Sequence, residues 1–140
     1  MAEKPTEPSA PPAARGRGAR ALLILIILVA AGSAAWSWLT LSWSYADGER
    51  AGVLQKFSHK GWICKTDEGE LAMYVVAGVA PQIWDFTVRD PNLVTQMNSL
   101  VGRRVQLHYT EHRGLPSSCF GDTRYFVDKV TLAPEGEAAN

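Results

Sequence analysis

The chain has 140 residues and a formal net charge of zero. That length allows one small folded domain and leaves little room for a nicotinamide-binding domain, and the GxGxxG and GxxxxGK[ST] phosphate-binding patterns are absent from it. The charge is uneven, because residues up to Arg20 carry +2 and the rest carries −2. A mildly acidic domain lacks the broad basic surface typical of nucleic-acid binding, so we expect no nucleic-acid partner.

The N-terminal part predicts a tail followed by one membrane-spanning helix. Residues 1–20 are rich in Pro, Ala and Gly and predict a disordered cytoplasmic tail. Residues 21–43 form an uncharged, largely aliphatic stretch, and about 20 such residues suffice to cross a bilayer. Aromatic rings favour the membrane interface. The residues expected to anchor the helix there are Trp36, Trp38, Trp43 and Tyr45.

Flanking charges predict the orientation of this helix. Arg15, Arg17 and Arg20 precede it, whereas Arg50 is the only basic residue shortly after it. By the positive-inside rule the N-terminus is cytoplasmic and the domain is periplasmic, on a bacterial inner membrane. A cleaved signal peptide is the alternative, because residues 32–35 are small. Both interpretations place the domain on the same side.

The remainder predicts a linker at 44–49, a domain at 50–133 and a flexible tail at 134–140. Alternating or apolar stretches separated by Gly- and Pro-containing turns indicate strands. The predicted strands are 50–57, 62–66, 70–76, 83–88, 103–110 and 125–132. Between the fourth and fifth, apolar residues at 93, 94, 97, 100 and 101 have helical spacing, with Asp90 as N-cap and Pro91 at the first position.

This order of strands, one helix and two further strands predicts an all-β domain with one helix. It matches a small barrel of the oligonucleotide/oligosaccharide-binding type, the OB-fold, preceded here by a single transmembrane helix. An SH3-like barrel or an open sandwich remains as an alternative. Fold by itself does not establish a ligand.

Cys64 and Cys119 are the only cysteines of the chain. Two cysteines in a domain outside the cytoplasm favour a disulfide bond, with two separate thiols as the alternative. Because the pair lacks CxxC spacing, a thioredoxin-like redox motif is not indicated.

Three stretches of the domain resemble a family of short bacterial membrane-anchored proteins of unknown activity. They are residues 44–73, Trp84–Asp90 (WDFTVRD) and Val101–Tyr109 (VGRRVQLHY). Members of such families sometimes carry a 6-phosphogluconate dehydrogenase label. The label does not suit this chain, which is short and has no dinucleotide fingerprint.

Aromatic residues interleaved with lysines form the best candidate binding face. On an OB-fold such residues can stack bases or sugars. The face comprises Phe57, Lys60, Trp62, Lys65, Tyr74 and Trp84. The alternative is that Trp62 and Trp84 fill the barrel core while the lysines cover its rim. The loop 115–122 is a second candidate for binding.

No catalytic or metal-binding residues are predicted. His108 and His112 would lie roughly 13 Å apart on an extended strand, too far to share one metal ion. Asp67, Glu68 and Glu70 are interpreted as a solvated hairpin tip, and no base can be assigned to Ser117, Ser118 or Cys119. We therefore expect no cofactor.

The sequence leaves three hypotheses about function. The first is a non-enzymatic binding or adaptor module in the periplasm, with a protein or envelope component as partner. The second is an accessory subunit of a larger inner-membrane complex, in which the small residues 30–35 permit close helix packing. The third, an enzyme of the dehydrogenase type, has the least support.

Overall fold

A computed structural model describes residues 15–73 and 77–134 of the chain. The chain divides into two units, Met1–Trp36 and Ser37–Asn140. Helix α1, Arg15–Ser42, provides the one helix among the described residues that is long and apolar enough to cross a membrane, within the span Gly18–Ser42. Length and composition fit both a membrane anchor and a signal sequence.

Helix α1 begins at Arg15 rather than at the predicted Ala21. Residues 15–20 contain two glycines, which are poor helix formers, so this segment continues the adjoining apolar helix and does not form by its own propensity. The predicted disordered tail is therefore wrong for residues 15–20, and its remaining residues lie outside the described part of the chain. The predicted interface residues Trp36, Trp38 and Trp43, like Tyr45 just beyond the helix, are exposed.

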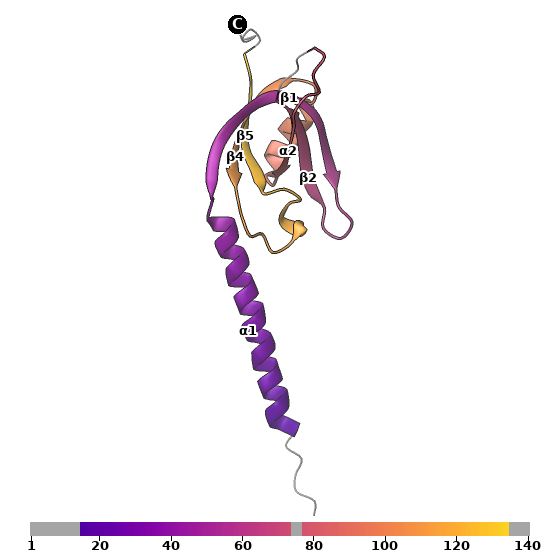
Figure 1. The fold of residues 1–140 in the computed structure, drawn as a ribbon. Helices are drawn as coiled ribbons and strands as arrows, with labels where there is room; N and C mark the ends of the chain where they lie inside the picture. Colours follow the sequence, from indigo (N-terminus) through magenta and orange to yellow (C-terminus); the bar gives the residue numbers. More distant parts are fainter. Residues whose placement is uncertain (1–14, 74–76, 135–140) are drawn as a thin grey trace, which may run out of the picture. The chain divides into compact units, whose positions relative to one another are not determined.

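The second unit is a closed five-stranded barrel with the strand order β1-β2-β3-β5-β4 (Figure 1). Among the strands of the described residues, β3 and β5 are the one pair that is parallel. Helix α2, Pro91–Ser99, lies between β3 and β4 in sequence, which is the arrangement of an OB-fold. The predicted fold class is thus confirmed. The strands are β1 Ala46–Lys60, β2 Thr66–Ala72, β3 Ile83–Val88, β4 Arg104–Glu111 and β5 Tyr125–Leu132.

Side chains that alternate along the strands fill the barrel, and α2 adds Leu93 and Met97 to the same core. The first turn of α2 is capped as predicted, because the Asp90 carboxylate accepts a hydrogen bond from the Asn92 backbone N–H at 2.8 Å. The fully buried large side chains include Leu54, Leu71, Phe86, Val105 and Leu107.

Three predicted boundaries differ from the structure. Strand β1 begins at Ala46, so most of the expected linker at 44–49 belongs to the barrel. Residues 62–65 lie in the connection between β1 and β2 rather than in a strand. The predicted strand 70–76 ends at Ala72 as far as the structure describes it, since 74–76 lie outside the described residues.

The predicted turn at Asp67–Gly69 is the largest error, because these residues lie within β2. A glycine at position 69 indicates a turn when only its neighbours in sequence are considered. In the structure it allows β2 to pack closely against a side chain of β3. A Cβ at this position would lie 2.2 Å from Cζ of Phe86. The glycine therefore leaves room for the Phe86 ring against the strand backbone, which only the paired strands β2 and β3 reveal.

Candidate binding surface

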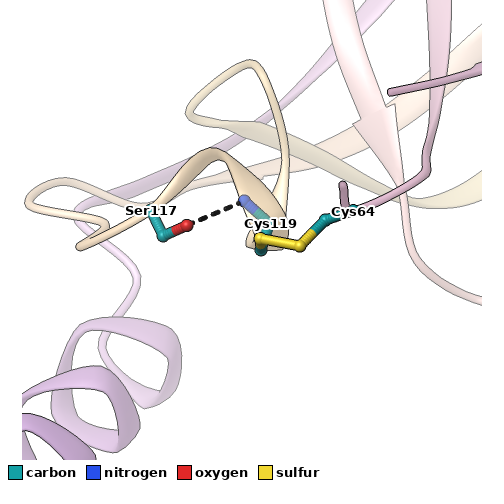
Figure 2. The surroundings of a disulfide bond; sticks show 3 residues. All are labelled: Cys64, Ser117 and Cys119. Atoms are coloured by element: carbon teal, nitrogen blue, oxygen red, sulfur yellow. Dashed lines mark hydrogen bonds between the residues drawn. A yellow bond between two sulfur atoms is a disulfide. The ribbon is translucent and has the colours of Figure 1, made fainter. Parts of the chain in front are cut away.

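Two loops of the barrel are joined covalently. The first loop, residues 61–65, connects β1 to β2, and the second loop, residues 112–124, connects β4 to β5. Cys64 and Cys119 form a disulfide with their Cα atoms 5.0 Å apart, as predicted (Figure 2). The equivalent loops of OB-folds take part in ligand binding. The bond therefore links the two segments of this barrel that are best placed to form a site.

The second loop also has a defined local structure around its cysteine. Residues Ser118–Phe120 form a short 3-10 helix. The Ser117 hydroxyl oxygen accepts a hydrogen bond from the Cys119 backbone N–H at 3.1 Å, as Figure 2 shows. Ser117 thus caps a turn, and Cys119 is consumed in the disulfide, so neither has the environment of an activated nucleophile.

A buried carboxylate holds the second loop against the barrel. Glu68 on β2 is only 6% exposed. Its two oxygens accept hydrogen bonds from the Thr87 hydroxyl at 2.8 Å and from the Asp122 backbone N–H at 3.1 Å. The predicted solvated tip at Asp67, Glu68 and Glu70 is therefore wrong. A buried charge needs such partners, and here one partner belongs to the loop.

Gly121 and Lys60 complete this attachment. Gly121 has a φ of +155°, and a Cβ there would lie 2.9 Å from Thr87 side-chain atoms, so a glycine permits the close approach. Lys60 at the end of β1 forms an ion pair with Asp122 at 3.3 Å. The second loop is thus fixed to β1, β2 and β3 as well as to the first loop.

The first loop carries the most exposed apolar side chains of the described barrel. Trp62 is 97% exposed and Ile63 is 89% exposed. They border a hollow of about 370 Å³ whose other side is formed by residues of the second loop, including Ser117, Ser118 and Asp122. Adjacent large apolar side chains in water are typical of an interaction site.

A larger hollow of about 520 Å³ lies within the second loop. Arg113 and Arg124 line it, and both approach the buried Glu111, at 3.0 and 3.7 Å. The Glu111 carboxylate raises the pKa of Arg113 above its ordinary value. Arg113 also lies 3.5 Å from the centre of the Tyr45 ring. This cluster was not predicted, since nothing in the local spacing indicates that β4 and β5 bring these residues together.

The predicted binding face does not form a single surface. Trp84 is 6% exposed and packs in the core against Phe86, Tyr109 and Tyr125, as the alternative interpretation expected for it. Phe57 is half-buried against the core. Tyr74 lies outside the described residues.

The other three residues of that face gather at the first loop. Lys60, Trp62 and Lys65 are all exposed there. Trp62 is therefore not a core residue, contrary to the alternative interpretation. Three of the six predicted residues thus lie beside the hollow between the first loop (61–65) and the second loop (112–124). We call the surface formed by these two loops the two-loop surface.

A guanidinium group covers the aromatic cluster around Trp84. Arg50 lies 4.9 Å from the Trp84 ring centre and 5.5 Å from that of Tyr109. Its Nη1 also lies 3.1 Å from Sδ of Met73. Arg50, which was counted above as a flanking charge of the apolar helix, lies within β1 and so has a structural role in the barrel.

Each histidine has its own local partner. His59 Nδ1 lies 2.9 Å from an Asp67 oxygen, and His108 Nδ1 lies 2.6 Å from an Asp128 oxygen. The hydrogen bond to Asp128 raises the pKa of His108, and the nearby Asp47 and Glu49 charges add to the effect. His112 donates from Nδ1 to the Thr40 backbone oxygen at 3.0 Å.

Comparison with known proteins shows a likeness of fold. No protein-family model matches the chain, and no curated protein matches it. A crystal structure of a mitochondrial single-stranded DNA-binding protein from S. cerevisiae is similar, with a TM-score of 0.49 and 9% identity. The match covers 68% of this chain and 100% of that one.

The likeness requires one correction to the expected partners. The prediction that excluded nucleic acid conflicts with a similar protein that is described as binding single-stranded DNA. The exclusion was based on the net charge of the domain. That sum averages over the whole surface and does not register a local pair of arginines such as Arg113 and Arg124.

Proposed function

We propose that the chain is a membrane-anchored binding or adaptor module without catalytic activity of its own. Helix α1 is retained as the anchor and the barrel lies in the periplasm of a bacterium. The two-loop surface binds a protein, a peptide or an envelope glycan. The resemblance of residues 44–73 to short membrane-anchored proteins is consistent with this proposal.

The observation that carries the proposal is the exposure of Trp62 and Ile63, at 97% and 89%. Tryptophan is among the residues that contribute most to binding interfaces. The pair borders a hollow to which both loops contribute. A partner that covers the two side chains would remove a large apolar area from water.

The rigidity of the surface is a second argument. The disulfide, the Glu68 hydrogen bonds and the Lys60–Asp122 ion pair hold the two loops together before any partner arrives. A preorganised surface loses less conformational entropy on binding than a mobile one.

Two features support the orientation. The basic residues Arg15, Arg17 and Arg20 precede the apolar part of the helix, which favours a cytoplasmic N-terminus. The disulfide is the kind of bond that persists in oxidising compartments such as the bacterial periplasm.

Photo-crosslinking in intact cells tests the proposal. A benzoylphenylalanine replaces Trp62, and in a matched protein it replaces Val79, which is also exposed, at 66%, but lies between β2 and β3. We expect a discrete adduct from position 62 and none from position 79. The double substitution Trp62→Ser and Ile63→Ser should weaken binding of that partner at least about tenfold, as expected for a central aromatic contact.

The same experiment can contradict the proposal. Absence of any discrete adduct at position 62, or the same adducts at positions 62 and 79, would show that the first loop is not a binding surface. The variants retain Cys64, so the disulfide and the loop attachment remain intact in all of them.

A further inference from the structure

The hollow in the second loop is lined by two arginines from opposite ends of that loop. Arg113 follows β4 and Arg124 precedes β5. The backbone N–H of His112 donates to the Arg124 carbonyl at 2.8 Å, which extends the β4–β5 ladder to the base of the loop. Both arginines line the hollow of about 520 Å³ and have side chains that are 53% and 57% exposed.

A single carboxylate lies between the two cations. Glu111 approaches Nε of Arg113 at 3.0 Å and Nε of Arg124 at 3.7 Å, and its side chain is only 10% exposed. Two guanidinium groups have about ten N–H donors, whereas a carboxylate has about four lone-pair sites. Glu111 therefore orients both arginines without satisfying either of them.

The other charged and titratable groups of the lining do not compensate for the remaining positive charge. Asp122 is paired with Lys60 at 3.3 Å. The His112 ring contacts the Thr40 carbonyl at 3.0 Å and the Thr110 hydroxyl at 3.2 Å. Among the residues that line the hollow, the two arginines therefore outnumber the one carboxylate, Asp122, while Glu111 and Glu68 are buried and not part of the lining.

The rest of the lining suits an oxyanion. Ser118 is exposed and lines the hollow close to Ser117, whose hydroxyl oxygen already accepts from Cys119. Its hydroxyl can donate to a bound oxygen atom. The disulfide and the Glu68–Asp122 hydrogen bond keep this part of the loop in place.

We propose that this hollow binds a phosphoryl group, with Arg113 and Arg124 as its cationic ligands and Ser118 as an additional donor. A tetrahedral phosphate can accept hydrogen bonds from two guanidinium groups and a hydroxyl at once, whereas one arginine alone satisfies a carboxylate. The inference goes beyond the proposed function, because the phosphoryl group can belong to a molecule other than the partner bound at Trp62 and Ile63.

Calorimetric titration of the full chain in detergent micelles with inorganic phosphate tests the inference. Arg124→Gln should weaken phosphate binding roughly 10-fold or more, as expected for a lost charge-assisted hydrogen bond. Arg124→Lys should be intermediate, since it keeps the charge and loses the planar fork. A thermal melt of each variant checks that the barrel is folded.

Two arginines elsewhere in the barrel provide the matched control. Arg103 and Arg104 are exposed and line a separate hollow of about 160 Å³ with Leu132 and Ala133. Arg103→Gln combined with Arg104→Gln should leave phosphate affinity unchanged. No measurable phosphate binding, or equal losses in the control and in Arg124→Gln, would overturn the inference.

Further arms identify the source of the phosphoryl group. Nanodiscs with phosphatidylglycerol test a lipid headgroup against nanodiscs with a phosphate-free galactolipid, and a short single-stranded DNA tests a nucleic-acid backbone. Arg124-dependent binding in either arm supports the inference and names the source. Loss of phosphate binding together with a discrete crosslinking adduct at position 62 would refute only the phosphate site. Phosphate binding without such an adduct would refute the proposed function.

Discussion

Trp62 and Trp84 show how position in the barrel determines what a residue does. Both are tryptophans in stretches with aromatic and basic neighbours, yet their exposed fractions are 97% and 6%. Trp84 lies on β3, where it points to the core and stacks against Phe86. Trp62 follows Gly61, which has a φ of +137° that other residues rarely adopt, and lies outside the barrel.

His108 provides a test at the residue scale. Its pKa is raised by the hydrogen bond to Asp128, so its stabilising contribution is present below about pH 6.5 and is lost as the pH rises through the higher pKa of the folded state. Because both side chains are partly exposed, the effect should be about 0.5 kcal/mol or less. His108→Gln should therefore flatten the decrease in unfolding free energy between pH 6 and pH 8.

Denaturant unfolding of the full chain in micelles at both pH values measures this difference. Asp128→Asn removes the partner and should flatten the profile in the same way. The other groups facing His108 are Asp47, Glu49 and, across the β4–β5 ladder, Lys129. An unchanged slope in His108→Gln would show that the contact between His108 and Asp128 does not contribute to the pH dependence of stability.

At the scale of elements, the two-loop surface depends on contacts between segments that are distant in sequence. The Cys64–Cys119 bond spans 55 residues, and the Glu68–Asp122 hydrogen bond spans 54. Both attach the second loop to the β1–β2 region. The arrangement explains how a loop of this length can present a defined hollow rather than a mobile connection.

Removal of the disulfide is the corresponding prediction. The double substitution Cys64→Ser and Cys119→Ser should lower the free energy of unfolding by about 4 kcal/mol in the chain-entropy model, and the unfolding temperature with it. Differential scanning calorimetry of the chain in micelles measures the change. The wild-type chain treated with reductant is the matched control.

The Glu68 contacts should survive this substitution, so hydrogen exchange at Asp122 N–H should remain slower than at Ser118. A variant as stable as the wild type would show that the loops are held by the noncovalent contacts alone. A variant that does not fold would show instead that the bond is required for the barrel itself.

At the scale of the whole molecule, helix α1 and the barrel form for different physical reasons. Helix α1 results from composition, because its apolar residues are exposed in the single chain and suit a lipid environment. The barrel results from long-range pairing of five strands. Changes in apolar composition should therefore affect helix α1, whereas changes in strand pairing should affect the barrel.

The orientation of the anchor is the prediction at this scale. Protease added to intact spheroplasts should digest the barrel and leave the N-terminal tail protected. Replacing Arg15, Arg17 and Arg20 by Glu should reduce or reverse this protection, because positive charges that flank an apolar helix favour the cytoplasmic side. The control replaces Arg103 and Arg104, which lie far along the chain from the helix, and should not change it.

Mass measurement of the mature chain accompanies the protease experiment. An intact mass supports a retained anchor, and a loss near residues 32–35 supports a cleaved signal. Protection of the barrel in spheroplasts would contradict the proposed orientation in either case.

Much of the fold can be predicted from local patterns. The uncharged run 21–43, the helical spacing after Asp90 and the alternation in β4 and β5 each depend on neighbours within a few residues, so they can be read along the chain. The boundaries are less accurate. Arg15–Arg20 extend α1 because an existing helix is easily lengthened at its end, and Ala46–Glu49 join β1 only because β4 lies beside them.

The candidate site could be predicted only in part. Cys64 and Cys119 followed from their number, and Trp62 and Lys60 from their residue types. Glu68 was misassigned, because its burial depends on Thr87 and on the loop backbone at Asp122. Such partners come from other strands and leave no signature in the sequence around the residue.

The amino-acid sequence alone was enough to predict the apolar helix, the position of α2 among the strands and the pair of cysteines. These follow from composition and short-range periodicity, which act before any distant contact forms. The folded barrel was needed to show that Trp62 stays in water while Trp84 is buried, and that Arg113 and Arg124 converge on Glu111. Closure of the barrel sets these environments, because it fixes which side chains from distant segments share a surface or a core.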